Sequence, residues 1–136
     1  MWVFLHDAFF SVVEDRKDKD VFVVRSRLQE DLEKVFVNDI TGLTVKNILE
    51  TENSDYRFRV FLPKSIFKEI MLNEIDDIDY HNFKNEVHDH ERKLHYTNVW
   101  SEMLDLQEHY YPPENSNNWL AYLQQKYGST HVLNEK

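Results

Sequence analysis

Histidines recur along the second half of the chain at multiples of seven residues. They are His81, His88, His95 and His109, and Glu102 occupies the missing place in the series. On a helix a seven-residue step returns nearly to the same face, so these side chains would form one slowly drifting stripe. Neighbours in the stripe would lie about 10 Å apart along the axis, given a rise of about 1.5 Å per residue. Because metal–nitrogen bonds are about 2 Å long, two members cannot share one ion. The pattern favours a solvated polar face, with a bound divalent metal as the alternative.

A second group of candidate ligands is the acidic cluster Asp76, Asp77 and Asp79. Three neighbouring carboxylates could hold a hard cation or meet a basic partner. The cluster lacks the turn glycine and the ligand spacing of a calcium loop. Such a cluster more often closes one helix and caps the next, and its mutual repulsion predicts exposure. We keep these residues as candidates for binding a partner.

Four arginines alternate with apolar residues in two β-prone stretches. Residues 21–28 place Arg25 and Arg27 on one side, and residues 55–62 place Arg57 and Arg59 on one side. This period of two is typical of half-buried strands. The opposite sides carry the predicted core residues Phe22, Val24, Ser26, Leu28, Tyr56, Phe58, Val60 and Leu62. If the two strands are neighbours, the arginines repel one another and need a counter-charge.

Two sources of that counter-charge follow from the sequence. A long C-terminal helix could cross the face and supply Glu91, Glu102, Asp105 or Glu108. Alternatively the face is open and binds an anion: a phosphate, a nucleic acid or an acidic protein surface. With Phe61 and Tyr56 nearby, an open face would be similar to sheets on which aromatic side chains stack the bases of single strands.

Composition excludes several classes of site. Two glycines are too few for a phosphate-cradling loop, and the absence of cysteine excludes disulfides and thiolate metal sites. No serine stands in a nucleophile elbow. We therefore expect no enzyme activity and no cofactor. The opening residues do not match a signal peptide and no apolar run is long enough to span a membrane, which predicts a cytoplasmic protein of unknown oligomeric state. A formal charge of -9 disfavours a general nucleic-acid coat.

The pattern of apolar residues predicts an α+β fold built from two ββα units. The predicted strands are 2–5, 8–14, 21–28, 43–49 and 55–62, and helices follow at 29–36 and after Pro63. Core positions of the two units match at an offset of 34 residues, which predicts a four- to five-stranded, mainly antiparallel sheet. A long helix from Asp79 or Asn82 to Tyr110 follows. Residues 1–110 are the predicted domain, and 111–136 are an extension with a short helix over Trp119–Tyr127.

Three stretches carry a resemblance. They are the opening MWVFLHDAFFSVVEDR with the later VVRSR, the segment DYRFRVF, and the segment IDYHNFK with Trp100. Together these stretches resemble a group of short bacterial and phage proteins of unknown function. The resemblance covers about residues 1–107 and implies no catalytic residues. Together with the acidic charge, it leads us to expect a non-enzymatic interaction protein, such as a phage-type inhibitor of a host defence complex (a CRISPR effector, for example) that binds protein. The alternative is a nucleic-acid or nucleotide-binding module that uses the arginine face.

Overall fold

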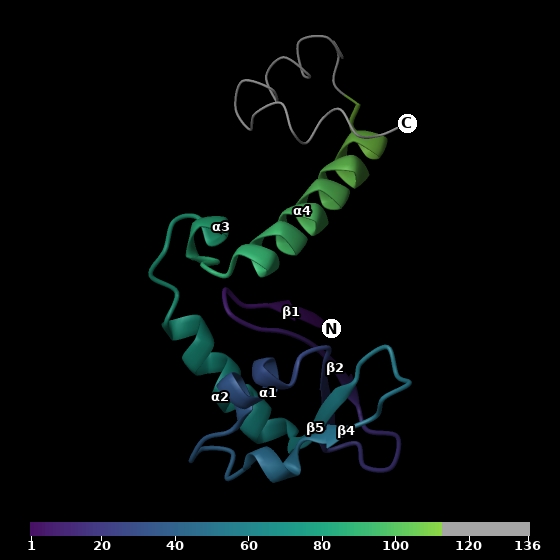
Figure 1. The fold of residues 1–136 in the computed structure, drawn as a ribbon, viewed down its shortest axis with the longest axis vertical. Helices are drawn as coiled ribbons and strands as arrows, with labels where there is room; N and C mark the ends of the chain where they lie inside the picture. Colours follow the sequence, from purple (N-terminus) through teal and green to yellow (C-terminus); the bar gives the residue numbers. More distant parts are fainter. Residues whose placement is uncertain (113–136) are drawn as a thin grey trace. The chain divides into compact units, whose positions relative to one another are not determined.

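The computed structural model describes residues 1–112, so the helix predicted over Trp119–Tyr127 lies outside the described residues. The chain divides into two compact units, the first spanning Met1–His88 and the second beginning at Asp89. The first unit contains the sheet and the second contains one long helix (Figure 1).

The first unit is built on a five-stranded sheet in which every neighbouring pair is antiparallel. Its spatial order is β1-β2-β3-β5-β4. The strands are β1 (Trp2–Phe4), β2 (Phe9–Glu14), β3 (Val21–Ser26), β4 (Leu49–Glu50) and β5 (Phe58–Pro63). The sheet together with its helices confirms the predicted α+β class.

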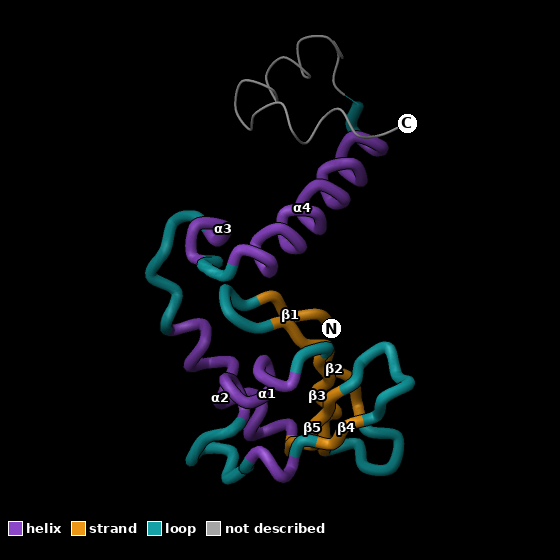
Figure 2. Tube along the Cα trace, viewed as in Figure 1, coloured by secondary structure: helices purple, strands orange, loops and turns teal. Residues whose placement is uncertain are grey.

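Two helices cover one face of this sheet, α1 (Gln29–Phe36) and α2 (Lys64–Asp76). Both contact β3 and β5, and both lie on the same side of the strands in Figures 1 and 2. The order β2-β3-α1 and then β4-β5-α2 matches the two predicted ββα units, with β1 added at the edge.

The core lies between the helices and the inner face of the sheet. Phe67 of α2 is its centre, because its ring lies 5.3 Å from Phe22, 6.1 Å from Phe36 and 6.4 Å from Phe10, centroid to centroid. Apolar residues at every second strand position reach this layer, as the period-two pattern predicted for Val24, Val60 and Leu62. The buried core residues are Ala8, Phe10, Val12, Val24, Leu32, Val35, Phe36, Val60, Leu62, Phe67 and Ile70.

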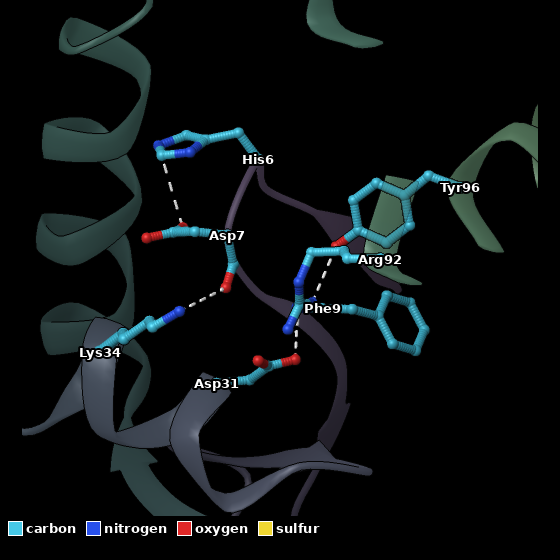
Figure 3. A network of polar contacts seen from close by, with 7 residues as sticks. All are labelled: His6, Asp7, Phe9, Asp31, Lys34, Arg92 and Tyr96. Carbon is cyan, nitrogen blue, oxygen red and sulfur yellow. Dashed lines mark hydrogen bonds and ion pairs between the residues drawn. The ribbon is translucent and has the colours of Figure 1, made fainter. Parts of the chain in front are cut away.

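Polar contacts tie the β1–β2 loop to α1 (Figure 3). The buried carboxylate of Asp31 accepts a hydrogen bond from the Phe9 amide at 2.9 Å, and Lys34 Nζ donates to the Asp7 carbonyl at 3.3 Å. His6 lies 3.9 Å from the Asp7 carboxylate. These bonds hold the first hairpin against the helix that covers it.

Two predicted strands are shorter than the periodicity suggested. The prediction of a strand over 43–49 is wrong, since residues Val45–Asn47 form a 3-10 turn (η1) and β4 has two residues. Asn47 Oδ1 accepts the Thr44 amide at 2.8 Å, and this local bond competes with strand pairing. Strand 21–28 ends at Ser26, and Leu28, predicted to be inward, is 51% exposed at the start of α1.

The long helix predicted from Asp79 or Asn82 to Tyr110 is interrupted. Its first part is the short α3 (Phe83–Glu86), and α4 (His90–Tyr110) begins anew after three residues. Asp89 caps α4 by accepting the Arg92 amide at 2.7 Å, the kind of bond that fixes a helix start. None of the helices within residues 1–112 is long and apolar enough to cross a membrane.

Candidate functional site

Pairing of β3 with β5 places two of the predicted arginines side by side. Arg25 is the direct cross-strand partner of Arg59, on the face of the sheet opposite α1 and α2. Arg27 and Arg57 follow just beyond the last ladder pair, Ser26 with Phe58. The expectation that the two arginine-bearing strands are neighbours is confirmed.

The two central guanidinium groups are held by neutral partners. Arg25 Nη2 donates to Ser11 Oγ at 2.9 Å, and Ser11 is the residue opposite Arg25 on β2. Arg59 Nη2 donates to Ser54 Oγ at 3.1 Å and to the Tyr56 carbonyl at 3.2 Å. Within residues 1–88 no carboxylate lies within ion-pair distance of either guanidinium. The first unit therefore supplies orientation for this pair but no counter-charge.

Each central arginine also retains donors that the described residues leave unused. The Nε–H groups of Arg25 and Arg59 are buried and donate no hydrogen bond to the described part of the chain. Their Nη1 groups likewise form no hydrogen bond with residues 1–88. A guanidinium has five N–H donors, and a buried donor without a partner costs about 1–3 kcal/mol. The buried Nε atoms are closed to a ligand, so the Nη1 groups are the donors that an acceptor-rich ligand could reach.

The outer arginines are satisfied differently. Arg57 forms an ion pair with Glu50 of β4 at 2.6 Å, and both side chains are about half exposed. Arg27 donates to the Asp55 carbonyl at 2.9 Å. The four arginines therefore separate into an unneutralised central pair and two rim residues with partners of their own.

Tyr56 is the clearest correction to the predicted strand over 55–62. The period-two pattern predicts a buried position on the core face; Tyr56 is buried, but its ring lies 4.8 Å from the guanidinium carbons of both Arg25 and Arg27. A hydrogen bond from the Thr51 amide to the Arg57 carbonyl, at 2.7 Å, closes a loop that takes Tyr56 out of the strand. The ring is only 4% exposed, so the loop packs Tyr56 firmly against the two cations.

Beside the central pair the outer face is hollowed, with a volume of about 590 Å³. Val13, Val23 and Phe61 line it and stand opposite one another on β2, β3 and β5, one row along from Arg25 and Arg59. This row forms the apolar floor, and Phe61 is 44% exposed.

The β2–β3 turn lines the hollow on another side. Arg16 adds a third positive charge there, and Glu14 and Asp15 contribute carboxylates. The Glu14 carboxylate is neutralised by Lys64 at 2.8 Å. The hollow thus combines three arginines with an apolar floor and one unneutralised carboxylate, that of Asp15.

Sequence reasoning did not identify Ser11, Arg16 or the stacking role of Tyr56. Ser11 carries one signal, a lone hydroxyl in an otherwise apolar strand. Arg16 carries none, because its approach to Arg25 depends on how the turn over residues 15–20 folds. Strand pairing brings Ser11 to Arg25, whereas Arg16 and Tyr56 are placed by the folds of a turn and a loop.

The acidic cluster is not part of this face. Asp76 is the last residue of α2 and Asp77 is its C-cap, whose amide donates to the Asn73 carbonyl at 3.0 Å. All three carboxylates of the cluster are exposed, as predicted, but α3 begins after Asn82, so Asp79 does not cap it. Because α2 covers the core side of the sheet, Asp76, Asp77 and Asp79 do not join the arginines.

The predicted histidine stripe forms only in its second half, where His95, Glu102 and His109 lie at seven-residue steps within α4. His81 and His88 lie outside helices, and His95 lies within α4, so the three do not share one helical face. Among the described residues no group of three or more His, Asp or Glu side chains is arranged to hold a metal ion.

The side chains around the hollow offer positive charge, N–H donors and an apolar floor, which together suit the binding of an anion. Comparison of the chain with protein-family models, with curated proteins and with solved structures gives no match.

Proposed function

We propose that this protein is a non-enzymatic binding protein whose outer sheet face holds an anionic group of its ligand. One observation carries the proposal: Arg25 and Arg59 oppose each other across β3 and β5 without a carboxylate from the first unit. Cross-strand neighbours have Cβ atoms about 5 Å apart, a spacing at which like charges destabilise a sheet. An anion between them removes that cost.

The free donors favour an anion with several oxygens. A phosphate or carboxylate accepts hydrogen bonds from planar guanidinium groups in a fork geometry, and such bonds are stronger than neutral ones. Ser11, Ser54 and the Tyr56 ring hold the two guanidinium groups in place before a ligand arrives. Preorganised cations lose little side-chain entropy on binding, which raises affinity.

Titration of inorganic phosphate, followed by calorimetry, tests the proposal. Arg25→Met and Arg59→Met should each weaken binding by at least about tenfold, because a charge-assisted hydrogen bond contributes about 1.5–3 kcal/mol. Arg57→Met is the matched control, since Arg57 lies on the same strand but is already paired with Glu50. Equal dissociation constants for wild type and all three variants, or no binding by wild type, would contradict the proposal.

A second candidate function is protein binding, as in a phage-type inhibitor of a host defence complex such as a CRISPR effector. The observation that favours it is an exposed apolar stripe on α4. The stripe repeats at spacings of four, three and four residues and comprises Val99, Met103, Leu106 and Tyr110. Apolar stripes at this spacing are the usual contact face of a helix. The acidic charge and the resemblance to small phage proteins agree with this candidate.

Retention of partners from a host lysate treated with nuclease distinguishes the two candidates. If α4 binds protein, the double variant Met103→Glu and Leu106→Glu loses a partner that Arg25→Met retains. If the arginine face binds the partner, Arg25→Met loses that partner and the double variant of Met103 and Leu106 retains it. A partner retained equally by both variants would contradict both assignments.

A further inference from the structure

We infer that the hollow beside Arg25 and Arg59 is a site for a single nucleotide, with its phosphate on the arginine pair and its base against Phe61. This inference rests on the proposed anion-binding function and names the ligand class. The volume of the hollow, about 590 Å³, falls within the range of about 300–1,000 Å³ that is usual for small-molecule sites.

The geometry of the sheet sets the distance between the two recognition elements. Phe61 is two residues from Arg59 on the same strand and on the same face. A strand rises about 3.4 Å per residue, so the aromatic row lies about 7 Å from the arginine row. This separation is comparable with that between the phosphate and the base of a nucleotide.

Phe61 is suited to contact a base. Its side chain is 44% exposed and stands beside Val23 on the floor of the hollow. Every base has a π-face that can stack on an aromatic ring, and Val13 extends the apolar surface on the next strand. A ligand consisting of phosphate alone would leave this surface unused.

The carboxylate of Asp15, which lines the hollow, disfavours binding of a longer nucleic-acid strand. The Asp15 carboxylate can accept hydrogen bonds from a sugar hydroxyl or a base amino group, but it repels a second phosphate. The formal charge of -9 acts in the same direction on a polyanion outside the hollow. The site therefore fits one nucleotide better than a nucleic-acid chain.

Comparison of the affinities of defined probes tests the inference with the intact chain. The four nucleoside 5′-monophosphates, ribose 5-phosphate, inorganic phosphate and a five-nucleotide single strand are titrated separately. At least one nucleotide should bind about tenfold more tightly than ribose 5-phosphate, the increment expected from stacking one base. Phe61→Leu should remove that increment and leave the affinity for inorganic phosphate unchanged, whereas Arg25→Met should weaken binding of both ligands.

Different results would overturn the nucleotide assignment and the anion site. Binding of inorganic phosphate with no gain from a base overturns the nucleotide assignment and leaves the anion site standing. The same assignment is overturned if the single strand binds more tightly than every mononucleotide. If neither inorganic phosphate nor any nucleotide binds, the anion site itself is wrong. The circular dichroism spectrum of Phe61→Leu should match that of the wild type, which checks that the substitution leaves the fold intact.

Discussion

Replacing Arg25 with methionine should leave the free protein at least as stable as the wild type, which is unusual for a partly buried charged residue with good contacts. Methionine keeps the unbranched stem but removes the charge. The variant loses the hydrogen bond to Ser11 at 2.9 Å and the stacking on Tyr56 at 4.8 Å. These two contacts together contribute about 2–3 kcal/mol.

Two costs disappear at the same time. Two unit charges at the Cβ spacing of cross-strand neighbours, about 5 Å, repel by about 1–3 kcal/mol for effective dielectric constants between about 80 and 20. This is an upper bound here, because Arg25 extends toward Ser11 on β2 and Arg59 toward Ser54. A buried Nε–H group without a partner costs about 1–3 kcal/mol more. Together the two relieved costs match or slightly exceed the contribution of the lost contacts, so we expect the free energy of unfolding to stay equal or to rise by up to about 2 kcal/mol.

Urea unfolding at low and high sodium chloride provides the assay. The advantage of Arg25→Met over wild type should shrink as salt screens the repulsion in the wild type. Added phosphate should stabilise the wild type by mass action and should stabilise Arg25→Met less at the same concentration, because the variant binds phosphate more weakly. Arg57→Met is again the control, and the loss of its exposed ion pair should cost less than about 1 kcal/mol at any salt.

A loss of more than about 3 kcal/mol in Arg25→Met would refute this reasoning, because it exceeds the contribution of the Ser11 and Tyr56 contacts and reaches the cost, about 3–5 kcal/mol, of leaving a buried partner charge unpaired. Such a loss would mean that a carboxylate neutralises Arg25 within the folded chain. The acidic residues predicted to do so are Glu91, Glu102, Asp105 and Glu108, and charge reversal at each would then identify the partner.

Three further predictions concern the first unit. Burial, and then the charges of Asp7 and Asp77, raise the pKa of Glu74 above its ordinary value of 4.5. Charged Glu74 therefore opposes folding, so Glu74→Gln should be more stable than wild type at pH 7, with a difference that vanishes below pH 4.5; a difference independent of pH would contradict this. Asp31→Ala should lower the free energy of unfolding by about 2 kcal/mol because the Phe9 amide loses its acceptor, whereas Asp31→Asn, which keeps an acceptor oxygen, should lose less. Phe67→Ala should cost about 3–5 kcal/mol in urea unfolding, since the ring contacts three other core aromatics, and a loss below 2 kcal/mol would mean that the core can collapse around the gap.

The local pattern of the sequence was sufficient for most of the elements. A period of two identified β3 and β5 and set the side on which Arg25 and Arg59 lie, because alternation along a strand is a property of the backbone itself. Helical spacing identified α1 and α2 for the same reason. Prediction was wrong where a local polar contact competed with strand pairing, as at Thr44 and Asn47, and where a new cap began a helix, as at Asp89.

Only the tertiary structure decided which residues meet. The sequence determined that Arg25 and Arg59 face the same way from their strands, but their direct opposition depends on the register of β3 against β5, across 34 residues of chain. The approach of Ser11 to Arg25 depends on the register of β2, and the closed loop before β5 moved Tyr56 from its predicted core position to the arginines. Periodicity reports the direction of a side chain along its own strand. The neighbours of that side chain on other strands are determined by long-range backbone hydrogen bonds, and those depend on how the whole core packs.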